Sequence, residues 1–308
     1  MKYTAYKMEF LNGVHLGKNS IEDSDITFCA DTLFSALCQE AVHAGEDKLQ
    51  DLYKRVKEGR IVFSDAMPYI GNTYYIPKPM LKVEKEVNGD SKTKKAFKKL
   101  SYIPLDKLDQ YMNGTMNVEQ EAEILDHLGV VVSRVFASVR GVEETKPYRV
   151  GICQFYPDNG LFIILGYEEK QDRVLVEELL TSLSYSGIGG KRYAGLGRFK
   201  LHPGKLEDDF CKRLSAESEY YMTLSVSLPL EEEMDKALAD AAYLLIKRSG
   251  FVASCEYAEE QLRKRDLFVL KAGSCVKNRY YGSIYDVSDR GKHPVYRYAK
   301  PMFLGVGI

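Results

Sequence analysis

Several features that would place a protein in a specialised class are missing from this sequence of 308 residues. No stretch approaches the ~18 consecutive apolar residues needed to cross a bilayer, and the first residues lack the apolar core of a signal peptide. The six cysteines are scattered singly, with no Cys-x-x-Cys pair and no histidine partner at metal-ligand spacing. We therefore expect a cytoplasmic protein with reduced thiols, no membrane segment, no metal and no cofactor.

Long tracts of proline or serine are missing as well, and 45% of the residues are hydrophobic, so we expect a folded body throughout. The length is sufficient for two domains, each with its own core. The net charge of −1 conceals an uneven distribution: residues 207–240 hold ten acids and three bases, whereas residues 261–300 hold ten bases, three acids and five tyrosines. This C-terminal basic stripe is either a surface that meets a polyanion or a solvated surface with its tyrosines packed in the core.

The most distinctive motif is a glycine-rich loop, residues 187–197, with the sequence Gly-Ile-Gly-Gly-Lys-Arg-Tyr-Ala-Gly-Leu-Gly. Glycine admits positive φ and lets backbone N–H groups approach a phosphate, while Lys191, Arg192 and the following Arg198 supply positive charge. Tyr193 adds an aromatic face for a base. These features predict a loop that binds nucleic acid. The alternative is a tight helix-to-strand connection with a solvated charged rim.

Two better-known phosphate-binding motifs do not fit this loop. A Walker A motif requires Lys-Ser/Thr directly after its second glycine, and reading from Gly190 to Gly195 places Leu196-Gly197 there. A dinucleotide fingerprint follows a strand and opens a helix, whereas this loop follows a helical pattern and leads into a strand. P-loop and Rossmann nucleotide binding are therefore not expected.

Hydrophobic periodicity predicts an α+β fold. In the N-terminal part the expected strands are residues 2–10, 60–63, 130–137, 148–156, 161–167 and 198–202, and the expected helices centre on residues 33–42 and 175–183. The turn at residues 157–160 predicts a hairpin between the strands that flank it. A lysine-rich stretch, residues 82–99, indicates an insertion. In the C-terminal part, strands at 221–228, 251–257 and 267–273 and a helix at 234–245 predict a partial repeat of the same split β-α-β order.

Two tandem ferredoxin-like domains with the glycine-rich loop in the first resemble the RAMP superfamily of CRISPR proteins. Three further segments resemble, in their order, one particular subunit of that superfamily: residues 31–37 (Asp-Thr-Leu-Phe-Ser-Ala-Leu), residues 98–104 (Lys-Lys-Leu-Ser-Tyr-Ile-Pro) and residues 295–298 (Val-Tyr-Arg-Tyr). Within the superfamily the chain resembles, over essentially its whole length, the type III-A (Csm) effector subunit that caps the crRNA 5′ handle. The resemblance implies two tandem ferredoxin-like (RRM-like, RAMP) domains: residues 1–204, with an insertion at about 82–128, and a degenerate domain at 219–308.

The resemblance also implies a function. It implies a non-catalytic RNA-binding subunit in antiviral defence, which grips the crRNA 5′ handle, meets target RNA indirectly, and joins the large polymerase-like subunit to the repeated backbone RAMP subunits. The start of the first helix would present N–H groups to phosphate, Asp31 would cap that helix or meet a base, and Phe97 in a thumb-like insertion would stack on a flipped base. The residues expected to contact RNA are Thr32, Ser35, Lys95, Phe97, Lys98, Lys99, Arg134, Arg140, Gly189, Gly190, Lys191, Arg192, Tyr193 and Arg198.

Three other functions stay open. A crRNA-processing endoribonuclease of the same superfamily carries a similar loop and often a catalytic histidine, for which His15 is the candidate. A backbone subunit that cuts target RNA would use a loop aspartate, for which Asp23 and Asp25 are candidates, although such residues are usually turn or cap residues. A protein-only scaffold would bind an acidic partner through the basic C-terminal stripe, without the steep salt dependence of RNA binding.

Overall fold

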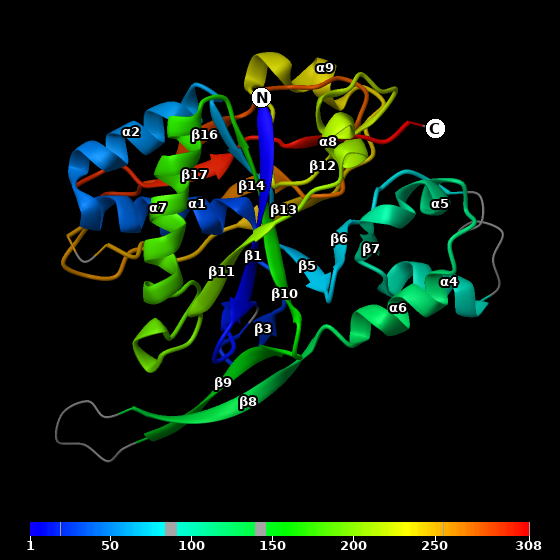
Figure 1. Cartoon of the computed structure of the whole chain (residues 1–308). Helices are drawn as coiled ribbons and strands as arrows, with labels where there is room; N and C mark the ends of the chain where they lie inside the picture. Colours follow the sequence, from blue (N-terminus) through cyan, green and yellow to red (C-terminus); the bar gives the residue numbers. More distant parts are fainter. Residues whose placement is uncertain (19, 84–90, 139–145, 255, 308) are drawn as a thin grey trace.

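An antiparallel sheet forms the centre of the fold. The computed structural model describes residues 1–18, 20–83, 91–138, 146–254 and 256–307. Within these ranges a seven-stranded sheet runs in the order β11-β1-β10-β5-β6-β7, and β4 pairs with β10 beside β5 (Figure 1). Its strands are β1 (Lys2–Phe10), β4 (Ile61–Phe63), β5 (Met67–Ile70), β6 (Thr73–Pro77), β7 (Tyr102–Pro104), β10 (Asn159–Tyr167) and β11 (Phe199–Gly204).

Strand β10 is buried on both faces, which shows that layers cover the sheet on both sides. It is an almost continuous apolar run, as expected for a strand between two layers. Successive side chains of a strand point to opposite faces, so Leu161, Ile163 and Leu165 join one hydrophobic cluster. Phe162 and Ile164 join the other. The two clusters therefore lie on opposite faces of the sheet.

Helices cover the first face (Figure 1). They are α1 (Ala30–Ala44), α2 (Glu46–Lys57) and α7 (Lys170–Ser186). The helices predicted at 33–42 and 175–183 are confirmed within α1 and α7. Helix α1 ends at Gly45, with φ 131°, and α7 ends at Gly187, with φ 82°, where the glycine-rich loop begins.

The second face is covered by the region predicted as an insertion, which folds into short helices. These are α4 (Ser91–Lys99), α5 (Leu108–Met112) and α6 (Val118–Asp126), with a 3-10 turn η1 (Leu105–Lys107). Phe97 is only 1% exposed, and its ring lies 6.1 Å from that of Tyr111. The prediction that Phe97 stacks on a base is wrong, because this ring is the large apolar side chain that anchors the lysine-rich helix α4 to the core.

Strands β8 (Gly129–Ser138) and β9 (Lys146–Phe155) form a long hairpin that extends away from the body of the molecule (Figure 1). The predicted hairpin between residues 148–156 and 161–167 is wrong, because β9 pairs with β8 and β10 pairs with β1, β4 and β5. The predicted turn does form, since Asp158 has φ 64° and the N–H of Asn159 donates to the carbonyl of Tyr156 (3.1 Å). It leads from a partly exposed two-stranded ribbon into the buried strand β10, so the two apolar runs belong to different sheets.

The C-terminal part forms small sheets in place of the predicted repeat. Its strands are β12 (Tyr221–Thr223), β13 (Leu245–Arg248), β14 (Leu267–Leu270), β15 (Cys275–Val276), β16 (Ser283–Asp286), β17 (Tyr296–Ala299) and β18 (Phe303–Gly305), and its helical segments are α8 (Asp208–Ser215), η3 (Glu231–Glu233) and α9 (Met234–Leu238). The helix predicted at 234–245 ends at Leu238, because Leu245 and the next three residues pair with β14. The strand predicted at 251–257 is reduced to a bridge between Phe251 and Arg263. The tandem arrangement is therefore not confirmed.

The C-terminal part packs against the start of the chain through a shared core. Val226, Val269 and Tyr298 belong to the same hydrophobic cluster as the buried side chains of α1 and α7. The ring of Tyr298 lies 5.8 Å from those of Phe34 and Phe63, and its hydroxyl accepts a hydrogen bond from the Phe63 N–H (2.9 Å). This packing places β13 and β17 beside α1.

Candidate nucleic-acid interface

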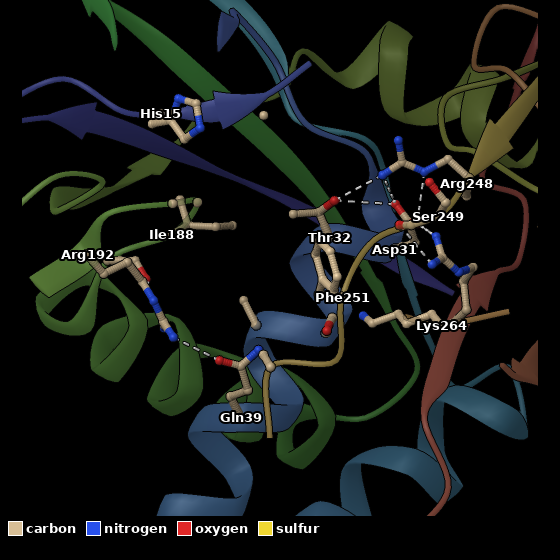
Figure 2. A pocket seen from close by; sticks show the side chains of 18 of the residues that line it. His15, Asp31, Thr32, Gln39, Ile188, Arg192, Arg248, Ser249, Phe251 and Lys264 are labelled. Atoms are coloured by element: carbon tan, nitrogen blue, oxygen red, sulfur yellow. Dashed lines mark hydrogen bonds and ion pairs between the residues drawn. The ribbon is translucent and has the colours of Figure 1, made fainter. Parts of the chain in front are cut away.

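A pocket of about 520 Å³ lies where the start of α1, the glycine-rich loop and the C-terminal part meet (Figure 2). Its lining residues are His15, Gly17, Asp31, Thr32, Ser35, Ala36, Gln39, Gly187, Ile188, Gly189, Gly190, Arg192, Arg248, Ser249, Phe251, Ala253, Lys264, Tyr296 and Arg297. Five residues predicted to contact RNA are in this set, namely Thr32, Ser35, Gly189, Gly190 and Arg192. The fold thus joins the two predicted sites, the helix start and the loop, in one cavity.

The α1 wall of the pocket presents polar side chains at helical spacing. Thr32, Ser35 and Gln39 are three and four residues apart, which places them on one face of the helix. Arg192 reaches across from the loop, and its Nη2 donates to Oε1 of Gln39 (3.0 Å), as Figure 2 shows. Its Nη1 also lies 3.5 Å from the carbonyl oxygen of Gly187. Hydroxyl, amide and guanidinium groups therefore converge on the same space.

At the start of α1, N–H groups predicted to meet phosphate are bonded within the protein. The N-cap is Cys29, so the prediction that Asp31 caps the helix is wrong. The N–H of Ala30 donates to Oδ1 of the buried Asp65 (2.8 Å), and the N–H of Thr32 donates to the carbonyl of Cys29 (2.9 Å). Asp65 lies between β4 and β5 and also accepts the N–H of Val226 (2.9 Å). Burial raises the pKa of Asp65 to about 7.

Asp31 lies inside the pocket as the partner of two arginines. Its side chain is only 5% exposed, and it forms ion pairs with Arg248 (2.8 Å) and Arg297 (2.8 Å). Burial alone would raise the pKa of Asp31, but the two guanidinium groups outweigh this effect and hold the pKa below its usual value. Asp31 is therefore an ionised carboxylate that is already neutralised by the protein.

The glycines of the loop allow it to pack closely on the segment after β1. The N–H of Gly190 donates to the carbonyl of His15 (2.9 Å), so the prediction that this N–H faces a phosphate is wrong. Gly189 has φ 88°, and a Cβ at that position would lie 2.5 Å from the same carbonyl oxygen. The alternative of a tight structural turn thus explains these two glycines, while Arg192 carries the positive charge of the loop into the pocket.

Lys191 and Tyr193 lie outside the pocket and connect the loop to the β8–β9 hairpin. Lys191 Nζ donates to the hydroxyl of Tyr148 on β9 (3.0 Å) and to that of Tyr193 (3.3 Å), and it lies 4.5 Å from the centre of the Tyr148 ring. The hydrogen bond that Lys191 donates to the Tyr148 hydroxyl raises the pKa of Lys191. The Tyr193 side chain is 80% exposed. These residues form a second, solvent-facing cation and aromatic group next to the pocket.

The other predicted RNA contacts are not part of the pocket. Arg134 on β8 and Arg198 before β11 are exposed. The three lysines of α4 predicted to bind RNA (Lys95, Lys98 and Lys99) lie with that helix on the opposite face of the sheet from α1. Lys99 pairs with Asp126, whereas Lys95 and Lys98 line a separate hollow with Ser91 and Lys94. Arg140 lies outside the described residues.

The cations from the C-terminal part were missed by the sequence prediction. The basic stripe at 261–300 contains Lys264 and Arg297, but no local pattern distinguishes them from the other cations of the stripe, and Arg248 lies outside it. Burial lowers the pKa of Lys264, and the positive charge of the nearby Arg297 lowers it further. Together with Arg192 these residues place four cations against the carboxylate of Asp31 among the described lining residues. The pocket therefore favours an anion.

The candidates for catalysis have mixed positions. His15 lines the pocket, and its Nδ1 lies 2.7 Å from the carbonyl oxygen of Gly151, so this nitrogen carries the proton. Asp23 and Asp25 do not line the pocket, and Asp25 pairs with Lys18 (3.4 Å).

In the ranges that the structure describes, no group of three His, Cys, Asp or Glu side chains is placed to hold a metal ion. No helix there has the length and hydrophobicity to span a membrane.

Comparison with known proteins assigns relatives along the whole chain. The family profile described as "CRISPR Csm4 C-terminal domain" matches residues 216–306. A "CRISPR system Cms protein Csm4" of Mycobacterium tuberculosis is 38% identical over 99% of this chain and 98% of its own length. The protein of the same name from Streptococcus thermophilus is 31% identical over 100% of both chains.

Solved structures share the fold. A chain in the crystal structure of the Csm3-Csm4 subcomplex of the type III-A CRISPR-Cas interference complex superposes with a TM-score of 0.65, at 20% identity and 99% coverage of both chains. A chain in the Csm1-Csm4 cassette in complex with cA4 gives a TM-score of 0.62, at 22% identity, over 100% of this chain and 99% of that chain. At these identities the likeness shows the shared architecture.

Proposed function

We propose, on the premise that this chain belongs to the Csm4 family of type III-A CRISPR (Csm) complex subunits, that it binds the crRNA 5′ handle in the pocket described above and does not cut it. The observation that carries this proposal is the convergence of Arg192, Arg248, Lys264 and Arg297 on a cavity with one carboxylate among its described lining residues. RNA phosphates are the polyanion that such a site favours.

The chemistry of the lining suits a nucleotide as well as a bare phosphate. The Thr32 and Ser35 hydroxyls can donate to phosphate oxygens, and arginine offers a planar fork for two of them. Phe251 is half-exposed at the pocket, where its ring can stack on a base, an interaction worth ~1–3 kcal/mol per base. Phe251 therefore takes the base-stacking role that the sequence suggested for Phe97.

Several observations favour binding without cleavage. Acid-base cleavage at a 2′-hydroxyl needs a base and an acid near the same phosphate. Among the described lining residues, His15 is the one imidazole, and Asp31 is held by Arg248 and Arg297. We therefore propose a non-catalytic role, and substitution of His15 should leave bound RNA intact.

We further propose that the chain links other subunits of the complex. The related structures contain Csm4 with Csm3 and with Csm1, so we assign to this chain the same two partners, the backbone subunit and the large subunit. The N-terminal sheet with α1 and α7 has the strand and helix order of a ferredoxin-like unit, and we interpret it as the RAMP-like core that carries the handle.

The experiment compares Arg192→Ala with a matched control, Arg213→Ala, in a surface helix outside the pocket. The ligand is a 3′-fluorescein RNA whose 5′ segment copies the CRISPR repeat of the host, and its anisotropy is measured over a salt series. Arg192→Ala should weaken binding roughly tenfold and reduce the salt slope, because it removes a charge-assisted contact, whereas Arg213→Ala should not. An affinity that does not change with salt concentration, or equal affinities for both variants, would favour the scaffold function. A denaturing gel of the bound RNA tests for cleavage.

A further inference from the structure

The carboxylate of Asp31 lines a pocket proposed to bind a polyanion. A carboxylate there has one of two effects. Either it repels phosphate and lowers the affinity, or it acts through the arginines around it. The contacts of Asp31 distinguish the two.

Asp31 joins arginines from two separate sheets. Arg248 lies on β13, which pairs with β14, and Arg297 lies on β17, which pairs with β16. Nε of Arg248 donates to Oδ2 of Asp31 (2.9 Å) and its Nη2 donates to Oδ1 (2.8 Å), a two-pronged contact that fixes the plane of the guanidinium. Nη1 of Arg297 donates to the same Oδ2 (2.8 Å). The carboxylate is thus a direct link between these two strands and α1.

The remaining contacts show how firmly Arg248 is held against α1. Its Nη2 also donates to Oγ1 of Thr32 (3.1 Å), so Nε and Nη2 are committed to α1 (Figure 2). Arg248 keeps about a quarter of its side chain exposed, whereas Arg297 is buried. Asp31 and Thr32 therefore fix the Nε and Nη2 edge of Arg248, an arginine that lines the pocket.

The two guanidinium groups need a counter-charge in order to lie together. Burial lowers the pKa of Arg297, and the nearby charge of Arg248 lowers it further. A buried charge without a partner is strongly disfavoured. Without the carboxylate, Arg297 would lose its ion pair, and the two cations would separate.

We infer that Asp31 is a positioning residue that holds Arg248 and Arg297 in place for the binding of RNA. This inference rests on the proposed function of the pocket. It predicts that the removal of a negative charge from the pocket weakens the binding of a polyanion. A carboxylate that merely opposes the RNA predicts the reverse.

The test measures the affinity of three full-length variants for the 3′-fluorescein repeat-derived RNA, together with their thermal unfolding. Asp31→Asn removes the charge and keeps the shape. Asp25→Asn makes the same change of charge on a half-exposed carboxylate outside the pocket. Arg248→Lys keeps the charge and removes the two-pronged contact, so it tests the inference if Asp31→Asn fails to fold.

Asp31→Asn should weaken binding roughly tenfold although it removes a negative charge from the pocket, while Asp25→Asn leaves affinity unchanged or slightly higher. Arg248→Lys should weaken binding several-fold with the salt slope unchanged. Equal or tighter binding by Asp31→Asn, or wild-type affinity in Arg248→Lys, would overturn the inference. If the wild-type chain itself fails to bind this RNA, the proposed function fails first, which is a separate result.

Discussion

Gly195 and Gly197 offer a matched test of whether backbone packing fixes the glycine-rich loop. Their φ angles are nearly identical, at 79° and 78°. A Cβ on Gly195 would find its nearest heavy atom, Nδ2 of Asn12, at 3.9 Å, whereas a Cβ on Gly197 would lie 1.9 Å from the carbonyl oxygen of Ile188. Alanine at either position incurs the same backbone cost, and alanine at 197 also displaces a neighbouring turn that lines the pocket.

The expected magnitudes follow from these two terms. The positive φ costs an alanine ~1–2 kcal/mol, so Gly195→Ala should lower the free energy of unfolding by that amount. For Gly197→Ala, the new Cβ and the Ile188 oxygen must move apart by about 1 Å to reach 3.0 Å, and overpacking of this kind adds ~1–3 kcal/mol. The total is ~2–5 kcal/mol.

Urea unfolding followed by circular dichroism measures the two free energies, and RNA anisotropy measures the effect on the pocket. Gly197→Ala should be the less stable variant and should also bind RNA more weakly, because Ile188 lines the pocket. Gly195→Ala should keep nearly full affinity. Equal destabilisation by the two alanines would refute the claim that close backbone packing determines the shape of the loop.

Three further predictions concern buried side chains of the protein core. The pKa of Asp65 is about 7 in the folded protein and ~3.9 in the unfolded chain, so the folded state binds more protons between these two values. The wild type should therefore lose stability relative to Asp65→Asn as pH rises from 5 to 8. A difference in urea midpoints that does not change with pH would contradict this. Glu40→Ala leaves the hydroxyls of Ser182 and Ser186 without their shared acceptor and should lower the free energy of unfolding by ~1–3 kcal/mol. Urea denaturation measures this loss, and an unchanged midpoint would show that the contact contributes nothing to stability. Phe97→Ala should lower the free energy of unfolding by ~3–5 kcal/mol in the same assay and leave RNA affinity unchanged at low temperature, where the variant is folded. A loss of affinity in the folded variant would support the base-stacking prediction instead.

The sequence predicted the helices α1 and α7 and the strands β1, β10 and β11 because their signals are local. The apolar spacing of residues 33–42 and 175–183 fits a helix whatever surrounds it, and glycines follow both helices directly. The partner of residues 148–156 could not be predicted, since two adjacent apolar runs joined by a good turn usually pair. Here one of them belongs to a protruding ribbon and the other to the centre of the sheet.

The candidate site was predictable only where it consists of motifs. Arg192 and Thr32 belong to segments with a recognisable pattern, and the fold brings them together in one pocket. Arg248 reaches the pocket because β13 pairs with β14 and packs beside α1, a contact between segments far apart in the chain. The prediction for Phe97 was wrong because its lysine-rich surroundings suggested an exposed side chain. A short amphipathic helix needs its large apolar side chain for packing.

The most direct test of the central claim is to map where the handle lies. An assembled complex would carry crRNA with 4-thiouridine in the repeat-derived 5′ segment, and ultraviolet cross-links to this chain would be assigned by mass spectrometry. The pocket predicts cross-links in peptides that contain Phe251 and the glycine-rich loop, residues 187–197, and predicts their loss in Arg248→Ala. Cross-links confined to α4 or to other subunits would contradict the account.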